Sequence, residues 1–133
     1  MRLLKLLPII AFAVLCSMLF SASTAYARPN IKFHADSVTF EQGEATVSGY
    51  FENTGDTDGY AKWIQFDLIL TADNGQEMWS DYGIFHELDD IYIPAYGAIE
   101  YTFYVQSEGI PEYHGKYRWQ FKNSRTHWDT SAG

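Results

Sequence analysis

The sequence has little cysteine and little positive charge, and both shortages restrict what the protein can be. Its 133 residues include one cysteine, Cys16, and only nine Lys and Arg against 17 Asp and Glu. Cys16 lies in an apolar N-terminal run, so the rest of the chain cannot form a disulfide and must be stabilised by packing. Because the basic residues form no stripe, we exclude nucleic acid as a partner.

The first 27 residues are typical of a cleavable signal peptide. Arg2 and Lys5 precede an apolar run that extends to Phe20, and Ala25-Tyr26-Ala27 forms an A-x-A cleavage site. We therefore expect export to the periplasm, the cell surface or the medium, with no membrane insertion after cleavage.

Two other interpretations of this segment are weaker. A retained anchor helix would need a longer apolar run, of about 20 residues, and has no use for a cleavage site. Lipid attachment at Cys16 would require a small residue before it, where this chain has Leu15.

The exported part, residues 28–133, has the length of a single domain. Cleavage removes two basic residues and no acidic ones, which leaves seven against 17 and a net charge of −10. A charge of this size favours solubility and repels anionic surfaces.

Apolar and polar residues alternate with the two-residue period of a strand, and no segment has helical periodicity. Asn74-Gly75 predicts a type I′ hairpin, and Gln42-Gly43 predicts a second turn. We expect an all-β fold, an antiparallel immunoglobulin-like β-sandwich of about seven strands, with a small barrel as the alternative. The alternation predicts strands at residues 31–33, 38–41, 45–52, 63–70, 77–82, 91–93, 99–106 and 116–122.

Residues 45–105 follow a pattern that starts with V-x-G-x-x-x-N-x-G at Val47 and continues with L-x-L-x-x-x-x-G, F-x-x-L and I-P. This pattern resembles secreted bacterial immunoglobulin-like accessory domains of the surface-layer-associated (SLAP) or FxLYD type. The resemblance implies an envelope-associated binding or spacer module. It also implies structural roles: a bulge or close approach at Gly49, a turn at Asn53 and Gly55, and a core plug made by Phe85 with Leu88.

The exported part has no set of residues typical of catalysis. It has no cysteine, no serine within a G-x-S-x-G elbow, and four histidines in four separate segments, so we expect neither an enzyme nor a cofactor or zinc site. The loop that carries Asp56 and Asp58 offers oxygen ligands for calcium, although it lacks EF-hand spacing and the closing Glu.

Aromatic residues make up 17% of the chain, and alternation divides them into two sets. Phe51, Phe66, Phe103, Trp119 and Phe121 fall on predicted inner positions. Tyr50, Trp63 and Tyr104 fall on outer ones, where we expect Trp63 to anchor a binding site flanked by the two tyrosines. A register error of one residue would reverse this assignment.

These observations favour a non-enzymatic exported module that binds or spaces a protein or glycan of the cell envelope. A carbohydrate-binding module is the first alternative, with the same aromatics and with Asp67 or Glu100 as hydroxyl acceptors. A small secreted enzyme or inhibitor is the second alternative. Self-association through a free sheet edge is also open.

Overall fold

The computed structural model describes residues 27–133, so the predicted signal peptide lies outside the described residues apart from Ala27. This part of the chain is all-β, with six strands: β1 (Ile31–Glu41), β2 (Glu44–Asn53), β3 (Gly59–Ala72), β4 (Glu77–Ile93), β5 (Ala98–Gln106) and β6 (Tyr117–Asp129). Within residues 27–133 there is no helix long and apolar enough to cross a membrane.

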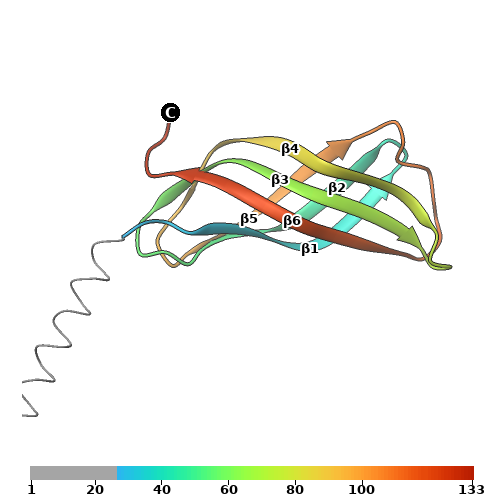
Figure 1. Cartoon of the computed structure of the whole chain (residues 1–133), viewed down its shortest axis with the longest axis horizontal. Coiled ribbons are helices and arrows are strands. Elements are labelled where there is room, and N and C mark those ends of the chain that lie inside the picture. The colour runs from blue at the N-terminus through green and yellow to red at the C-terminus, as the bar shows by residue number, and fades with distance from the viewer. Residues whose placement is uncertain (1–26) are drawn as a thin grey trace, which may run out of the picture.

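The six strands form two antiparallel three-stranded sheets that pack as a β-sandwich (Figure 1). Sheet A has the order β1-β2-β5 and sheet B has the order β4-β3-β6. The chain changes sheet after β2, after β4 and after β5, so each sheet combines strands from both halves of the sequence. The predicted sandwich is confirmed.

The structure has six strands where seven were expected, because β-bulges bend the long strands β1 and β4 without ending them. The segments predicted at 31–33 and 38–41 belong to one strand, β1, which has a register shift between Ala35 and Ser37. Gly49 lies opposite this bulge, and a Cβ atom on Gly49 would lie 2.0 Å from the carbonyl oxygen of His34. The bulge and close approach expected at Gly49 are therefore both present.

A cluster of phenylalanine rings joins the two sheets. The Phe33 ring of sheet A lies 4.9 Å from Phe51, 5.3 Å from Phe103 and 5.6 Å from Phe121 of sheet B, measured between ring centroids. Phe66, also of sheet B, stacks on Phe121 at 4.7 Å and contacts Phe103 of sheet A at 5.3 Å across the interior. Phe51, Phe66 and Phe103 are buried as predicted, whereas Phe121 is only partly buried because β6 is an edge strand.

The hairpin predicted at Asn74-Gly75 joins β3 to β4, but its turn type is different. The Gly75 N–H donates to the Ala72 carbonyl at 2.9 Å, and the Ala72 N–H donates to the Gln76 carbonyl at 2.8 Å. Gly75 has a φ of 87°, whereas Asn74 has no positive φ, so the loop is a three-residue turn with glycine in the left-handed position. A type I′ turn needs positive φ at both residues, and that part of the prediction is wrong.

Asn53 is the buried polar centre of one end of the sandwich. Its Oδ1 accepts hydrogen bonds from the N–H groups of Asn30 and Gly55, each at 3.0 Å. Its Nδ2 donates to the Thr57 carbonyl at 2.8 Å and to the Ile93 carbonyl at 3.2 Å. The asparagine of the sequence motif therefore ties together the N-terminal segment, the loop after β2 and the end of β4.

Candidate binding surface

The fold divides the predicted binding residues between two opposite faces. Tyr50 on β2 and Tyr104 on β5 lie on the outer face of sheet A, as does Glu100. Trp63 and Asp67 lie on β3, on the outer face of sheet B. The two tyrosines therefore cannot flank Trp63, and this grouping is corrected. The prediction failed because the chain changes sheet between β2 and β3, and the alternation of side chains along the chain does not show which sheet a strand joins.

The predicted residues on sheet A, which are Tyr50, Tyr104 and Glu100, lie among polar side chains. Tyr50 stands opposite Glu100 in the β2–β5 register, and its ring stacks on His34 with centroids 4.9 Å apart and planes 24° apart. Tyr104 is 55% exposed and lies opposite Thr46. Elsewhere on this face the hydroxyls of Ser48 and Thr102 are 3.1 Å apart, and Nε2 of His34 lies 3.3 Å from Oε1 of Glu52.

On the outer face of sheet B, three aromatic side chains, one from each strand, lie in a row. Trp63 on β3 stacks on His127 of β6, with centroids 5.2 Å apart and planes 16° apart. On its other side Trp63 meets Phe85 of β4, at 5.4 Å and 41°. We call Phe85, Trp63 and His127 the aromatic row. The near-parallel rings of Trp63 and His127 overlap in an offset stack, so His127 covers part of one Trp63 face, whereas Phe85 lies tilted against Trp63.

Phe85 corrects one expectation. The sequence pattern placed Phe85 with Leu88 as a core plug, but Phe85 is 54% exposed while Leu88 is buried. Side chains alternate across a strand with period two, so two residues three positions apart point to opposite faces. His86, between them, faces inward and lies 5.0 Å from the Phe103 ring, and partial burial lowers its pKa.

Sequence reasoning missed two of the three members of the aromatic row. Phe85 could have been predicted to face outward, because it lies three positions from the buried Leu88 in the same strand. No signal in the sequence identified His127, because its place beside Trp63 depends on the β3–β6 register, in which the two residues pair directly.

A polar network supports the row. Arg125 on β6 donates from Nη2 to Oε1 of Gln65 at 3.1 Å, and Gln65 lies opposite Phe85 in the β3–β4 register. On the other side of the row along β3, Lys62 pairs with Asp90, whose Oδ2 also accepts the Gly133 N–H at 3.0 Å. These groups form a polar rim around an aromatic centre.

Asp67 holds two bulges in place. Its Oδ1 accepts the N–H of Gly83 at 2.8 Å, and its Oδ2 accepts Nδ2 of Asn123 at 2.8 Å. Gly83 and Asn123 have φ values of 67° and 55°, and each belongs to the bulged part of a strand beside β3. The Asn123 bond, followed by the Gly83 bond, holds the pKa of the Asp67 carboxyl below its usual value. Both oxygens of this predicted hydroxyl acceptor therefore already have protein donors.

The two calcium candidates are similarly engaged. Asp56 accepts hydrogen bonds from the Arg28 N–H and the Thr57 hydroxyl, each at 3.1 Å. Asp58 accepts from the Tyr92 hydroxyl at 2.8 Å and the Ala95 N–H at 2.9 Å. Across residues 27–133, no group of three or more His, Cys, Asp or Glu side chains is arranged to hold a metal ion. Nothing in this geometry adds support to the calcium hypothesis.

No protein-family model and no curated protein matches the chain. One similar solved structure is described as the X-ray structure of Northeast Structural Genomics Consortium target SoR45. It is 13% identical, the match covers 80% of this chain and 87% of that chain, and the TM-score is 0.34. The resemblance to SLAP or FxLYD domains therefore stays a prediction.

Proposed function

We propose that the protein is an exported, non-enzymatic, immunoglobulin-like β-sandwich that binds a protein of the cell envelope through the aromatic row. The observation that carries the proposal is the alignment of Phe85, Trp63 and His127 across three strands on one open face. Aromatic side chains surrounded by a polar rim are the usual centre of protein–protein interfaces. Here Gln65 and Arg125 belong to that rim.

The geometry of the rings favours a protein partner over a glycan. A sugar ring stacks on an open aromatic face, but one face of Trp63 is partly covered by the stacked His127 ring, and the tilted Phe85 ring lies 5.4 Å away on the other side. Asp67, the expected hydroxyl acceptor on this side, is engaged by Gly83 and Asn123. A protein side chain can instead pack against the ring edges and the exposed flank of Phe85.

The non-enzymatic part of the proposal rests on the chemistry of the row and its surroundings. Neither Trp63 nor Phe85 can act as an acid, a base or a nucleophile, and His127 is stacked against Trp63. The nearby carboxylate, Asp67, holds the bulges of β4 and β6. These roles suit recognition rather than turnover.

Immobilised protein tests the proposal when it is exposed to detergent-solubilised envelope proteins from the cells that make it. We expect a specific protein to be retained by the wild type and by Tyr104→Ala, which removes an aromatic ring from the opposite face. Trp63→Ala should weaken retention about thirtyfold, as the loss of an interface hot spot of about 2 kcal/mol does. Equal retention by both variants would rule out the aromatic row as the site.

The carbohydrate-binding alternative has its own test. Purified envelope polysaccharides are titrated into the protein while tryptophan fluorescence is recorded, with Trp63→Phe as the control that assigns the signal. A saturable change that is absent in Trp63→Phe would favour the glycan. A flat titration leaves the protein partner as the proposal.

A further inference from the structure

Two free strand edges face each other along one side of the sandwich. β1 is an edge of sheet A and β6 is an edge of sheet B, and the two lie side by side in Figure 1. Within residues 27–133, no strand pairs with the outer edge of either one. Each edge therefore presents backbone N–H and C=O groups that a further strand could pair with.

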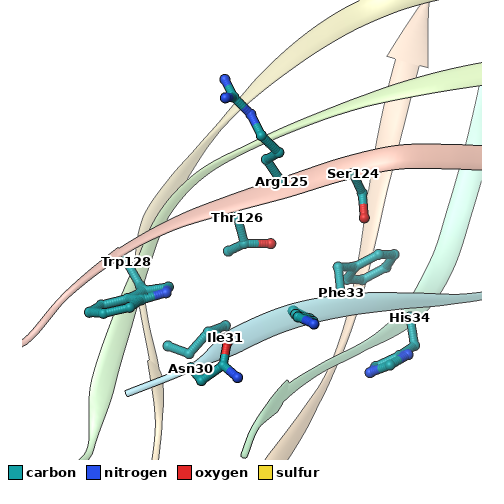
Figure 2. Close-up of a pocket in the computed structure, with 9 residues that line it drawn as sticks. Asn30, Ile31, Phe33, His34, Ser124, Arg125, Thr126 and Trp128 are labelled. Atoms are coloured by element: carbon teal, nitrogen blue, oxygen red, sulfur yellow. The ribbon is translucent and has the colours of Figure 1, made fainter. Parts of the chain in front are cut away.

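A groove of about 470 Å³ runs between these edges. Residues 30–34 line it from the β1 side, and Ser124, Arg125, Thr126 and Trp128 line it from the β6 side. Figure 2 shows the Ser124 and Thr126 side chains lying between β6 and β1, with Trp128 toward one end, whereas Arg125 points away. The groove thus combines hydroxyls, an indole and two unpaired backbone edges.

One group in this groove has an unmet hydrogen bond. Oγ1 of Thr126 is buried, and among the described residues no donor or acceptor lies within hydrogen-bonding distance of it. Buried hydroxyls in proteins usually have a partner, because leaving one unpaired destabilises the fold.

The charge of the groove is opposite to that of the protein. The exported part carries −10, yet none of the nine described residues that line the groove is acidic; Lys32 is basic, as is Arg125 at the rim, whose side chain points away toward Gln65. Three other surface hollows of the described region each include at least one carboxylate. Four of the seven basic residues of the exported part lie on β6 or just before it: Lys116, Arg118, Lys122 and Arg125.

We propose that this groove takes up an extended acidic segment of a partner protein, which pairs with the free edge of β6 as an added strand. The bulge at residues 123–124 interrupts β6, so the pairing segment is Arg125–Asp129, about five residues or 17 Å of strand. Alternate side chains of the ligand face inward toward Trp128 and Thr126, and the others face outward on the side of β6 that carries Arg125. Main-chain bonds supply affinity, and the acidic side chains supply selectivity.

This site opens on the side of the sandwich between β1 and β6, whereas the aromatic row lies on the outer face of sheet B, and the two share only Arg125 and His127 of β6. Lys32 on β1 belongs to the groove alone, so variants at Lys32 and at Trp63 let the two proposals fail separately. Trp63→Ala should leave binding of the peptide at the groove largely unchanged, and Lys32→Gln should leave retention by the aromatic row unchanged.

Synthetic six-residue peptides test the proposal with the purified protein. The probe alternates Val and Glu; one control replaces every Glu with Lys, and another carries N-methyl groups on alternate backbone nitrogens. We expect the acidic peptide to bind at least about tenfold more tightly than either control and to protect amides of residues 125–129 from hydrogen exchange. Equal binding of the Lys peptide, or no protection of β6, would overturn the proposal.

Two protein variants with the same charge change sharpen the result. Lys32→Gln removes a positive charge from the groove and should weaken the acidic peptide about two- to fivefold at low salt. Thr102→Glu adds the same negative charge to the outer face of sheet A and should change binding little. An equal effect of both variants would show a long-range charge effect only, and would contradict the site.

Light scattering of the protein without peptide tests whether a second copy of the protein fills the groove instead. We expect a monomer mass across the concentration range of the binding experiment. A mass that rises with concentration, together with protection of residues 125–129, would mean that a second copy fills the groove, and the proposal of a separate partner would be wrong.

Discussion

Replacing Asn53 with alanine should destabilise the domain more than any other single change at this end of the sandwich. The Asn53 side chain is fully buried and makes four hydrogen bonds to backbone groups of three segments. Alanine removes all four and leaves the Ile93 carbonyl without this partner in a buried position.

The expected size follows from the hydrogen bonds. Each contributes about 0.5–1.5 kcal/mol net, so the loss is about 4 kcal/mol. A domain of this size has a free energy of unfolding of about 5–15 kcal/mol, so Asn53→Ala would lose a large part of it. Urea unfolding followed by tryptophan fluorescence and circular dichroism measures the change, provided that the m-value stays constant.

Two further variants in this network, one at Asn30 and one at Asn53, separate the possible causes. Asn30→Ala removes the exposed bond from Asn30 Nδ2 to the Thr54 hydroxyl and should cost less than about 1 kcal/mol. Asn53→Asp keeps the shape but places a carboxylate oxygen against the carbonyls of Thr57 and Ile93, so it should be at least as harmful as alanine at neutral pH. A loss below about 1 kcal/mol for Asn53→Ala would refute the assignment of Asn53 as the centre of this network.

Three other predictions follow from single features of the chain. Thr126→Val should raise the free energy of unfolding by about 1 kcal/mol, because it replaces a buried, unpaired hydroxyl with a methyl group; a loss on urea unfolding would show that the hydroxyl has a partner. Partial burial lowers the pKa of His86 in the folded state, so the unfolded chain binds this proton first and stability should fall as the pH drops below about 6.5. His86→Leu should flatten that slope in thermal melts between pH 8 and pH 5, and an unchanged slope would exclude His86 as its source. Mass spectrometry of the exported protein should find Arg28 as the first residue, and a chain that still carries residues 1–27 would contradict cleavage after Ala27.

Alternation along the chain predicted the strands and most of the core because it depends only on local geometry. Each predicted strand segment falls within or largely overlaps an observed strand, and Phe51, Phe66 and Phe103 are buried as expected. Local chemistry also located the hairpin at Asn74-Gly75 and the bulge opposite Gly49. The type of the Asn74-Gly75 turn was wrong, since φ at Asn74 depends on how the flanking strands pair.

The candidate site was less predictable because it depends on which strands share a sheet. Trp63 was identified as an outer aromatic, but Tyr50 and Tyr104 lie on the other sheet. The partner of Trp63 on β6, His127, is 64 positions away in the sequence and is placed by the β3–β6 register. Bulges add to the difficulty, since each one shifts the alternation of the strand that follows it.

Site-specific photocrosslinking in the cells that make the protein tests the central claim most directly. A photoreactive phenylalanine analogue replaces Phe85 in the aromatic row, and in a matched strain it replaces Tyr104 on the opposite face, which is equally exposed. The account predicts one discrete crosslinked envelope protein from position 85, none from position 104, and loss of the product when Trp63→Ala is added. No crosslink at position 85, or the same product from both positions, would contradict the aromatic row as the binding surface.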